Sequence, residues 1–535
     1  MRVDDIIEKL SVEELVGQLL CFDFYGKDDP KEIERILRDI KPGGIFLQQM
    51  TAEQVKTYTQ IANTYSTVPV IVAGEIEGGA NKTIIELGSL PNQMAFGSAD
   101  DPELLEKLGR VLGNACRKGG FHWAYSPVVD INYNFMASAS NVRCFSDSPN
   151  HVIKMAKAFV NGLEYNHNLV ACCKHFPGEG VDDRNSHFMT TVNNLSKEEW
   201  METYGYIYKE MIKAGVSTIM AGHVALPAYE TECDPIYGYP PAVFSKSILT
   251  DLLKGELGFN GCIVSDAMSM IGASACVRDL KEISIKFLRA GGDMILFPEP
   301  TDYQVILDAL KSGELDMERV KDAVRRIFQL KQKANLFGDY PELEEKDTES
   351  VSDIAQSLAD KSIKVIRDYD GILPLKLKKG GKILVISVLE PYFQKSPTGK
   401  EFDPFIEEFK KEGYQVDLMI NPKHKDVQPL LGDYEAVLLN CKMSSEDYHG
   451  ATLRIGWNNI MVLWRAYVLQ HPNFVFTSFG DPYKLYDAPY LKTYINAYSG
   501  DSTSQRAVAK VLLGKLKPQG KNPVEFKGFF EREVD

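Results

Sequence analysis

Residues 169–187 read LVACCKHFPGEGVDDRNSH, and this stretch says most about the fold. Its first five residues, LVACC, are apolar and partly β-branched, which is typical of a strand buried on both faces of a parallel sheet. Lys174 and His175 follow at once and are expected at the carboxyl end of that strand. The motif FPGEG then ends regular structure and predicts an irregular loop. We expect the chemistry of the protein in this loop, whose ionisable residues include Glu179, Asp182, Asp183 and His187.

Seven further runs of the same kind occur in the first two thirds of the chain, each between helix-like stretches. They lie at 17–24, 44–47, 68–73, 123–131, 217–220, 261–264 and 294–297. Eight strands that alternate with helices predict an α/β fold, a (β/α)8 TIM-type barrel over residues 1–338. A doubly wound sheet shows the same alternation, but eight units in about 340 residues suit a barrel better.

Ionisable side chains follow most of these runs. They are Glu75 and Glu77 after the third run, Asp130 at the end of the fourth, Lys174 and His175 after the fifth, His223 after the sixth and Asp266 after the seventh. The carboxyl ends of barrel strands all face one side, where barrel enzymes keep their active sites. The sequence therefore predicts an enzyme rather than a purely structural protein.

The residues after Gly338 predict a second α/β domain. Residues 339–350 are acidic and poor in apolar residues, as in a linker. Strand-like runs at 382–388, 414–420, 436–440 and 474–478 then alternate with helix-like stretches such as 354–365 and 457–469, which predicts an αβα sandwich over residues 351–520. In the last stretch the apolar positions at helical spacing are Ile460, Leu463, Trp464 and Val468. The basic and aromatic residues 521–535 are expected to form an irregular tail.

The composition excludes several classes of partner. The 535 residues are 44% hydrophobic and 25% charged, and the net charge of −14 argues against nucleic acid, whose phosphates would be repelled. No apolar run approaches the roughly 18 residues of a membrane span, and the amino terminus lacks the apolar core of a signal peptide. The nine cysteines show no CxxC spacing, so we expect a reduced, cytoplasmic protein in which Cys172 and Cys173 are small core residues.

Asp266 lies behind an apolar strand in GCIVSDAMSM and allows several interpretations. A carboxylate there can act as a nucleophile, a base or a metal ligand, or it can cap the following helix. With His175, His187 and His223 it can also hold zinc or iron, but HxH and HExxH spacings are absent, so we expect no metal. GxGxxG and GxxxxGKT are absent as well, so we expect no cofactor. His223 alone is expected to be a core residue bonded to backbone.

Ordered motifs along nearly the whole chain resemble glycoside hydrolase family 3, and in particular its bacterial β-N-acetylglucosaminidase branch. In the first part they are KHFPGEG, VSDAMSM, EGG at 77–79, SPVVDI at 126–131, RCFSDSP at 143–149 and GHVALP at 222–227. In the second part they are GILPL, SFGDPY and GKNPV. The resemblance implies a retaining, exo-acting β-glycosidase of the β-N-acetylhexosaminidase type.

The resemblance also implies roles for individual residues. Asp266 matches the nucleophile that forms a glycosyl-enzyme intermediate. His187 matches the histidine that serves as general acid/base, and Asn185 stands two residues before it, where the branch typically has an aspartate that orients the ring. The residues that resemble sugar ligands are Lys174, His175 and Arg143, with Glu75 in place of a family aspartate and Asp130 in the pocket wall or in a structural role.

Two substitutions in the loop change the family pattern, Asn185 and the Glu179 that replaces the second histidine of GHG. An amide orients the imidazole of His187 but cannot offset its positive charge, unless Asp182, Asp183 or Glu179 does so. Besides a β-N-acetylhexosaminidase or β-glucosidase, the open alternatives are a phosphorylase or transglycosidase, since losing a carboxylate lessens repulsion of phosphate, and a weakly active sugar-binding homologue. The expected partner is a small β-linked carbohydrate, with no nucleic acid and no membrane, and the oligomeric state is left open.

Overall fold

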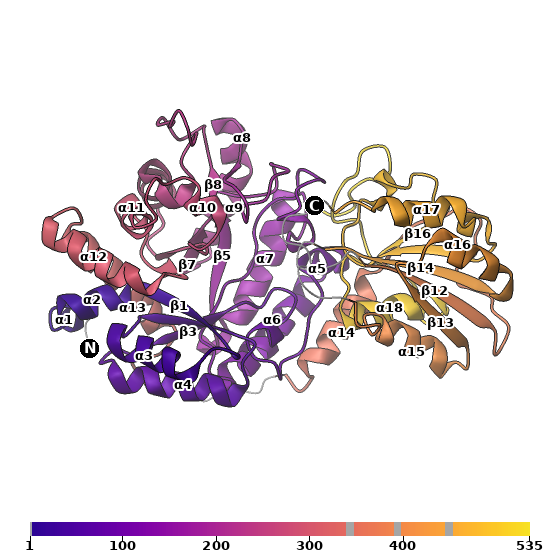
Figure 1. Ribbon diagram of the computed structural model, residues 1–535, viewed down its shortest axis with the longest axis horizontal. Helices are drawn as coiled ribbons and strands as arrows, with labels where there is room; N and C mark the ends of the chain where they lie inside the picture. The colour runs from indigo at the N-terminus through magenta and orange to yellow at the C-terminus, as the bar shows by residue number, and fades with distance from the viewer. Residues whose placement is uncertain (1–2, 339–346, 390–396, 445–452) are drawn as a thin grey trace. The chain divides into compact units, whose positions relative to one another are not determined.

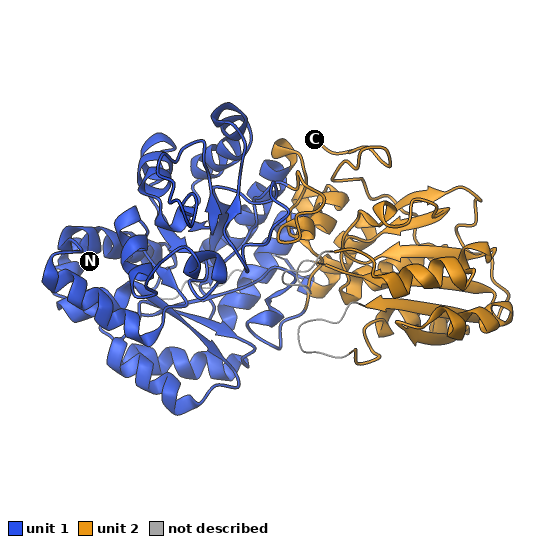
Figure 2. Ribbon diagram, turned by 45° about the horizontal axis from the view of Figure 1, so that its top comes forward, with its two compact units in different colours: residues 1–88, 105–131, 152–351 blue, residues 89–104, 132–151, 352–535 orange. Residues whose placement is uncertain are grey.

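The computed structural model describes residues 3–338, 347–389, 397–444 and 453–535. The chain forms two compact units (Figure 2), one of residues 1–88, 105–131 and 152–351 and the other of residues 89–104, 132–151 and 352–535. A single division at residue 338 differs from these units, because two early segments cluster with the later part of the chain. The predicted linker at 339–350 lies mostly outside the described residues.

The first unit contains the predicted barrel. Its eight parallel strands are β1 (Leu20–Tyr25), β2 (Gly44–Gln48), β3 (Ile71–Gly74), β4 (Trp123–Ala124), β5 (Val170–Phe176), β7 (Thr218–Ala221), β9 (Cys262–Ser265) and β10 (Ile295–Leu296). They are hydrogen-bonded in the order β10-β1-β2-β3-β4-β5-β7-β9, and a parallel bridge between Val264 and Met294 joins the two ends. All eight predicted strands are therefore confirmed.

Strand β4 is shorter than the predicted run of nine residues. The regular strand is limited to Trp123 and Ala124, and Pro127, which has no N–H to donate, follows three residues later. The chain still runs beside β5, because Val128 bridges to Lys174 and the Val129 N–H donates to the Lys174 carbonyl over 2.8 Å. This course carries Asp130 to the carboxyl end of β5.

Helices connect the barrel strands (Figure 1). They include α3 (Pro30–Ile40), α4 (Ala52–Tyr65), α6 (Pro102–Lys118), α7 (Pro149–Leu163), α9 (Tyr204–Lys213), α11 (Glu282–Ala290), α12 (Pro300–Ser312) and α13 (Met317–Lys333), with a π-helix η5 (Ser247–Glu256). In α3 the buried residues Ile33, Ile36, Leu37 and Ile40 recur at one-turn spacing and form the stripe that faces the sheet. None of the helices in the described ranges has the length and apolar run that a bilayer crossing needs.

Lys331 of α13 is a destabilising feature of the barrel at neutral pH. Its side chain is fully buried, its Nζ donates to Gln18 Oε1 over 2.7 Å, and burial lowers the pKa of Lys331 to about 7. Between pH 7 and the ordinary lysine pKa, the unfolded chain binds more protons than the native one, so the free energy of unfolding rises with pH in this window.

We therefore expect Lys331→Met to raise the free energy of unfolding at pH 7 by about 1–3 kcal/mol, after allowing for the lost bond to Gln18. The gain should shrink toward pH 10, where the lysine of the unfolded wild type also begins to lose its proton. Urea denaturation at pH 6, 8 and 10 measures it. Lys321→Met, at a partly exposed position of the same helix, is the control and should show no such pH dependence. A gain for Lys331→Met that is equal at all three pH values would contradict this account.

The second unit contains a six-stranded sheet. Its strands are β11 (Lys364–Asp368), β12 (Lys382–Leu389), β13 (Gln415–Ile420), β14 (Ala436–Lys442), β15 (Phe474–Ser478) and β16 (Thr493–Asn496). Their order is β11-β16-β15-β14-β12-β13, and β11 alone is antiparallel to its neighbour. The four predicted strands are confirmed. The predicted helix 354–365 ends earlier, as α14 (Val351–Ser362), and β11 follows it.

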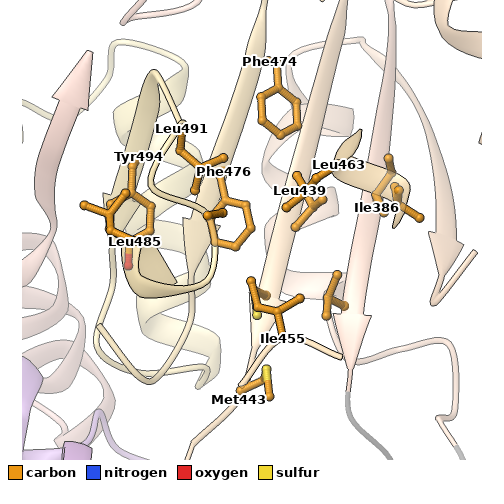
Figure 3. Packing of buried hydrophobic residues seen from close by; sticks show 14 of the residues in the cluster. Ile386, Leu439, Met443, Ile455, Leu463, Phe474, Phe476, Leu485, Leu491 and Tyr494 are labelled. Carbon is orange, nitrogen blue, oxygen red and sulfur yellow. The ribbon is translucent and has the colours of Figure 1, made fainter. Parts of the chain in front are cut away.

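Helices cover both faces of this sheet. Figure 1 shows α16 (His424–Val427) and α17 (Trp457–Arg465) on one side, and α15 (Asp403–Lys411) and α18 (Ser502–Leu512) on the other. On the α17 side, Figure 3 shows Leu463 beside the sheet residues Leu439 and Ile386. Phe402, Phe405 and Phe409 belong to the core on the opposite side, together with residues of α18. The predicted αβα sandwich is confirmed.

Candidate active site

Lys174 lies in β5 and is held between two carboxylates that follow β3. Its Nζ is 2.8 Å from Glu75 Oε2 and forms a second ion pair with Glu77 Oε1, and the ammonium group is almost completely buried. The other oxygen of Glu75 accepts the backbone N–H groups of Ile76 and Glu77, each over 3.0 Å. The predicted pair Glu75 and Lys174 is thus brought together, and Glu77 joins the site although the sequence reasoning did not count it among the site residues.

His175 is oriented by Asp130. Its Nδ1 is 2.7 Å from Asp130 Oδ2, and since a carboxylate can only accept, Nδ1 carries the proton. Asp130 Oδ1 accepts the backbone N–H groups of His175 and Glu179, over 3.2 and 2.8 Å. Both side chains are buried. The ring of His175 is therefore fixed, with Nε2 as the nitrogen available to other partners.

Asp130, His175 and Glu179 are also residue types that bind divalent metal ions, and they offer atoms within 4.8 Å of one another. However, both oxygens of Asp130 already accept protein N–H groups, one of them from the His175 ring. A metal ion would have to break the Asp130–His175 bond. The arrangement fits a support that positions His175 better than it fits a metal site.

Glycine is required where the loop leaves β5. A Cβ atom on Gly178, whose φ is +119°, would lie 2.0 Å from the ring of Tyr204. The Tyr204 hydroxyl donates to the Glu179 carbonyl over 2.5 Å, and Asn193 Nδ2 donates to the Gly178 carbonyl over 3.1 Å. These contacts fix the buried start of the loop.

Asp266 follows β9 at the same end of the barrel. Its backbone N–H donates to the Ala221 carbonyl at the end of β7, and its Oδ1 accepts the Ala267 N–H, each over 2.8 Å. Burial raises the pKa of Asp266, but the imidazoles of His223 and His175 and the Ala267 N–H outweigh it, so the pKa lies below the ordinary value. A carboxylate that stays ionised is suited to nucleophilic attack.

The interpretation of Asp266 as a helix cap is wrong. The next helix, α10 (Ile271–Ser274), begins five residues later and has Met270 at its cap position. The hydrogen bond of Asp266 goes to its own neighbour Ala267 instead. The carboxylate is therefore not used to satisfy a helix end.

His223 is confirmed as a buried residue bonded to backbone. Its Nε2 donates to the Ala267 carbonyl over 2.9 Å, and burial lowers the pKa of His223. The imidazole is therefore neutral at pH 7. It holds the turn that carries Asp266.

His187 is bonded directly to Asn185. The Asn185 Oδ1 accepts both the His187 Nδ1–H, over 2.7 Å, and the His187 backbone N–H, over 3.0 Å. This tautomer makes Nε2 the ring nitrogen that can take up and release a proton. Asn185 is buried and His187 is half-buried. The buried amide therefore fixes the orientation of the imidazole ring.

No carboxylate of the loop takes the place of this amide at Nδ1. Asp182 accepts from the Arg184 guanidinium and, over 2.8 Å, from the Val192 N–H. Burial raises the pKa of Asp182, but Arg184 outweighs it and the net shift is downward. Asp183 is exposed, and Glu179 lies in the buried cluster with His175.

The loop that carries His187 is fastened next to the turn that carries Asp266. Thr190 Oγ1 donates to the Gly272 carbonyl over 2.9 Å, and a Cβ on Gly272 would come within 2.2 Å of the Ser186 carbonyl oxygen. His187 is accordingly one of the groups that lower the pKa of Asp266. The structure thus brings together Asp266, His187 and Asn185 with the cluster of Lys174 and His175.

Arg143 belongs to the second compact unit, in η2 (Asn141–Arg143). Its Nη1 donates to the Ala139 carbonyl over 2.9 Å, and its own carbonyl accepts from Gln93 Nε2 over 2.7 Å. Its assignment as a sugar ligand stays a prediction.

Cys172 and Cys173 are fully buried in β5, as predicted for core residues. Burial raises the pKa of Cys172 to about 12, which makes this thiol a poor nucleophile. All nine cysteines lie in the described part of the chain and form no disulfide.

Comparison with known proteins identifies the family. The family model described as glycosyl hydrolase family 3 N terminal domain matches residues 11–330. A Cellulomonas fimi protein named β-N-acetylglucosaminidase/β-glucosidase is 30% identical over 545 residues, which cover 97% of this chain and 94% of that protein.

Two solved structures show the same architecture. One is of the β-glucoside phosphorylase BglX bound to 2FGlc and has a TM-score of 0.86 and 28% identity, covering 98% of this chain and 96% of that one. The other is of a glycoside hydrolase family 3 β-N-acetylglucosaminidase from Paenibacillus sp. str. FPU-7, with a TM-score of 0.83 and 23% identity, covering 96% of this chain and 99% of that one. The second supports the fold alone. With its barrel, the site at the barrel mouth and these matches, the chain belongs to glycoside hydrolase family 3.

Proposed function

We propose that this enzyme removes a terminal β-linked sugar by a two-step retaining mechanism, with a β-N-acetylhexosaminide as substrate. The observation that carries the proposal is the pairing of Asp266, whose pKa is lowered, with His187, whose tautomer is fixed by Asn185. Asp266 can then attack as the nucleophile, and His187 can transfer a proton.

In the first step an oxygen of Asp266 attacks the anomeric carbon while His187 Nε2 gives its proton to the leaving oxygen. The bond to the aglycone breaks, and a covalent glycosyl-enzyme forms. In the second step His187 Nε2 takes a proton from water, which displaces Asp266 and releases the sugar with its original anomeric configuration. Lys174 and His175 are the proposed ligands of the sugar hydroxyls beside Asp266, and Arg143 is a further proposed ligand.

The choice of sugar is supported by the name of the Cellulomonas fimi relative, which gives both N-acetylglucosaminide and glucoside activities. A β-glucoside is therefore the second substrate to test. A reduced, cytoplasmic location is supported by the nine cysteines, which form no disulfide.

A second activity, transfer of the sugar to phosphate, is favoured by one observation. The partner of His187 Nδ1 is a neutral amide, and Asp182 is neutralised by Arg184. A carboxylate at position 185 would repel an approaching phosphate dianion, and an amide does not. In phosphorolysis, phosphate replaces water in the second step and leaves as the sugar 1-phosphate. The similar protein BglX is named for such an activity.

The test is to assay nitrophenyl β-N-acetylglucosaminide and β-glucoside with and without added inorganic phosphate, with analysis of the sugar product. Free sugar in both conditions supports hydrolysis. Sugar 1-phosphate, formed at a rate that rises with phosphate, supports phosphorolysis. If both glycosides bind and neither is cleaved in either condition, the enzymatic proposal fails and a sugar-binding role replaces it.

Replacing Asn185 by aspartate should change the acid/base group in a defined way. A carboxylate at Nδ1 stabilises the imidazolium, so we expect the basic limb of the kcat/KM profile to move up by about one pH unit or more. The same charge should weaken any use of phosphate relative to water. The pH profile and the product ratio measure the two effects. Asp183→Asn alters an exposed carboxylate of the same loop and should leave the limb in place; a limb that is unmoved in Asn185→Asp would mean that His187 is not the group that titrates.

A further inference from the structure

Helix α17 of the second unit carries an exposed apolar stripe. Of the four tryptophans in the chain, Trp123 and Trp200 are fully buried, whereas Trp457 and Trp464 are 71% and 58% exposed. The two exposed tryptophans stand at the ends of α17, seven residues apart and therefore on one side of the helix. Exposure of tryptophan side chains to water is energetically unfavourable, so this placement indicates a surface that binds a partner.

The two tryptophans of the stripe lie outside the face that α17 buries in its own domain. That inner face consists of Asn459, Val462 and Leu463, and Leu463 packs on the sheet (Figure 3). Helical spacing alone groups Trp464 with Leu463, and the structure places Trp464 outside this face. Ile460 and Met461 lie between the tryptophans and are half-buried, and Ile460 also packs against the core of the domain.

The order of residues in the stripe is nearly symmetric about its midpoint. Positions i, i+3, i+4 and i+7 read Trp457, Ile460, Met461 and Trp464, with the tryptophans at the outside and the aliphatic residues at the centre. The eight residues 457–464 contain no charged side chain, in a protein that is 25% charged. A surface that reads the same in both directions can pair with itself across a twofold axis.

We propose that α17 pairs with α17 of a second copy of this chain, antiparallel and across a twofold axis. Trp457 of one copy then packs against Trp464 of the other, and Ile460 and Met461 form the centre. Tyr467, half-exposed just beyond the helix, extends the patch, and the Arg465 guanidinium lies 5.1 Å from the centre of the Trp464 ring. Trp, Tyr and Arg are the residues that contribute most to protein interfaces.

The size of the patch sets the expected strength of the pairing. The exposed parts of the three aromatic side chains amount to about 400 Å² per copy. This is about half of the roughly 800 Å² that each partner contributes to an interface of standard size. The dimer is therefore expected to be weak and to form in a concentration-dependent way, and it needs no part of the proposed active site.

Sedimentation velocity of the full chain over a range of concentrations tests the proposal. The apparent mass of the wild type should rise toward that of a dimer as the concentration increases. Trp457→Lys and Trp464→Glu should each weaken association at least about tenfold. The double variant carrying both changes should associate less than either single variant, because it removes all four tryptophans from the pair. Tyr369→Lys, at an equally exposed aromatic residue elsewhere in the same unit, is the control.

Circular dichroism and turnover of the best glycoside, both expected to match wild type, show that each variant is folded. A wild type that is monomeric at all concentrations overturns the proposal. So does a dimer that is unaffected by the single variants, or one that persists in the double variant. If the tryptophan variants instead lose binding to an oligosaccharide while the wild type stays monomeric, the stripe is a glycan-binding surface and the dimer is rejected.

Discussion

Asp266→Gly is expected to lower kcat/KM by about 10⁴-fold or more for every substrate, because it removes the atom that forms the covalent bond. No neighbouring carboxylate can substitute. Glu75 and Glu77 are held by Lys174, and Asp130 is held by His175. Folding should be little affected, since the main lost contact is one hydrogen bond to the Ala267 N–H.

A small anion distinguishes loss of the nucleophile from a general loss of structure. In the space left by Asp266→Gly, azide can attack the anomeric carbon directly and should restore cleavage of an activated nitrophenyl glycoside, giving an α-glycosyl azide. Asp266→Asn fills that space and should be inactive without rescue. If Asp266→Gly keeps more than about a tenth of wild-type activity without azide, another group is the nucleophile. In the wild type, the lowered pKa of Asp266 places the acidic limb of kcat/KM below the usual range of aspartic acid.

Most of the barrel could be predicted because strands buried on both faces must be short and apolar on every residue. The runs 44–47 and 261–264 show this, and both fall within one residue of the strands β2 and β9. Strand β11 could not be predicted, for the opposite reason. It is a half-buried edge strand, and its sequence KVIRD contains charged residues that resemble a helix end. Strand β11 is held extended by its pairing with β16, which lies more than 120 residues later in the chain. Such a distant pairing produces no pattern in the local sequence.

Helix α17 shows a different limit of sequence reasoning. Its apolar residues lie on both sides, so helical spacing alone does not say which side meets the sheet. Leu463 and Trp464 are adjacent in sequence, yet the first is 1% exposed and the second 58%. The buried side is set by the shape of the sheet under the helix, which the sequence of the helix does not contain.

In the active site, contacts within one loop or among strand ends at the barrel mouth were accessible from sequence. Asn185 and His187 are two residues apart, and Glu75 and Lys174 lie at the carboxyl ends of β3 and β5, which β4 separates. The anchoring of the His187 loop on Gly272 depends on the paths of long excursions between strands. Such paths are fixed by many weak contacts at once, so no local pattern predicts them.

His187→Gln is expected to have an effect that depends on the leaving group, which no purely structural role would produce. For a disaccharide, whose leaving oxygen needs a proton, kcat/KM should fall by about 10²–10⁴-fold. For a dinitrophenyl glycoside, which leaves without a proton, the first step should be nearly unchanged. The second step still lacks its base, so the glycosyl-enzyme on Asp266 should accumulate and be visible by mass spectrometry of the intact protein.

Azide needs no base, so it should speed the breakdown of this intermediate and yield a β-glycosyl azide. Asp266→Gly is expected to give the α-anomer under the same conditions, and the two products separate the nucleophile from the acid/base group. His175→Gln is the matched control, since a histidine that binds the sugar should affect good and poor leaving groups alike. If His187→Gln lowers kcat/KM equally for the disaccharide and for the dinitrophenyl glycoside, the proton of the leaving group comes from another residue. The side chain of His187 would then contribute to substrate binding and not to bond cleavage.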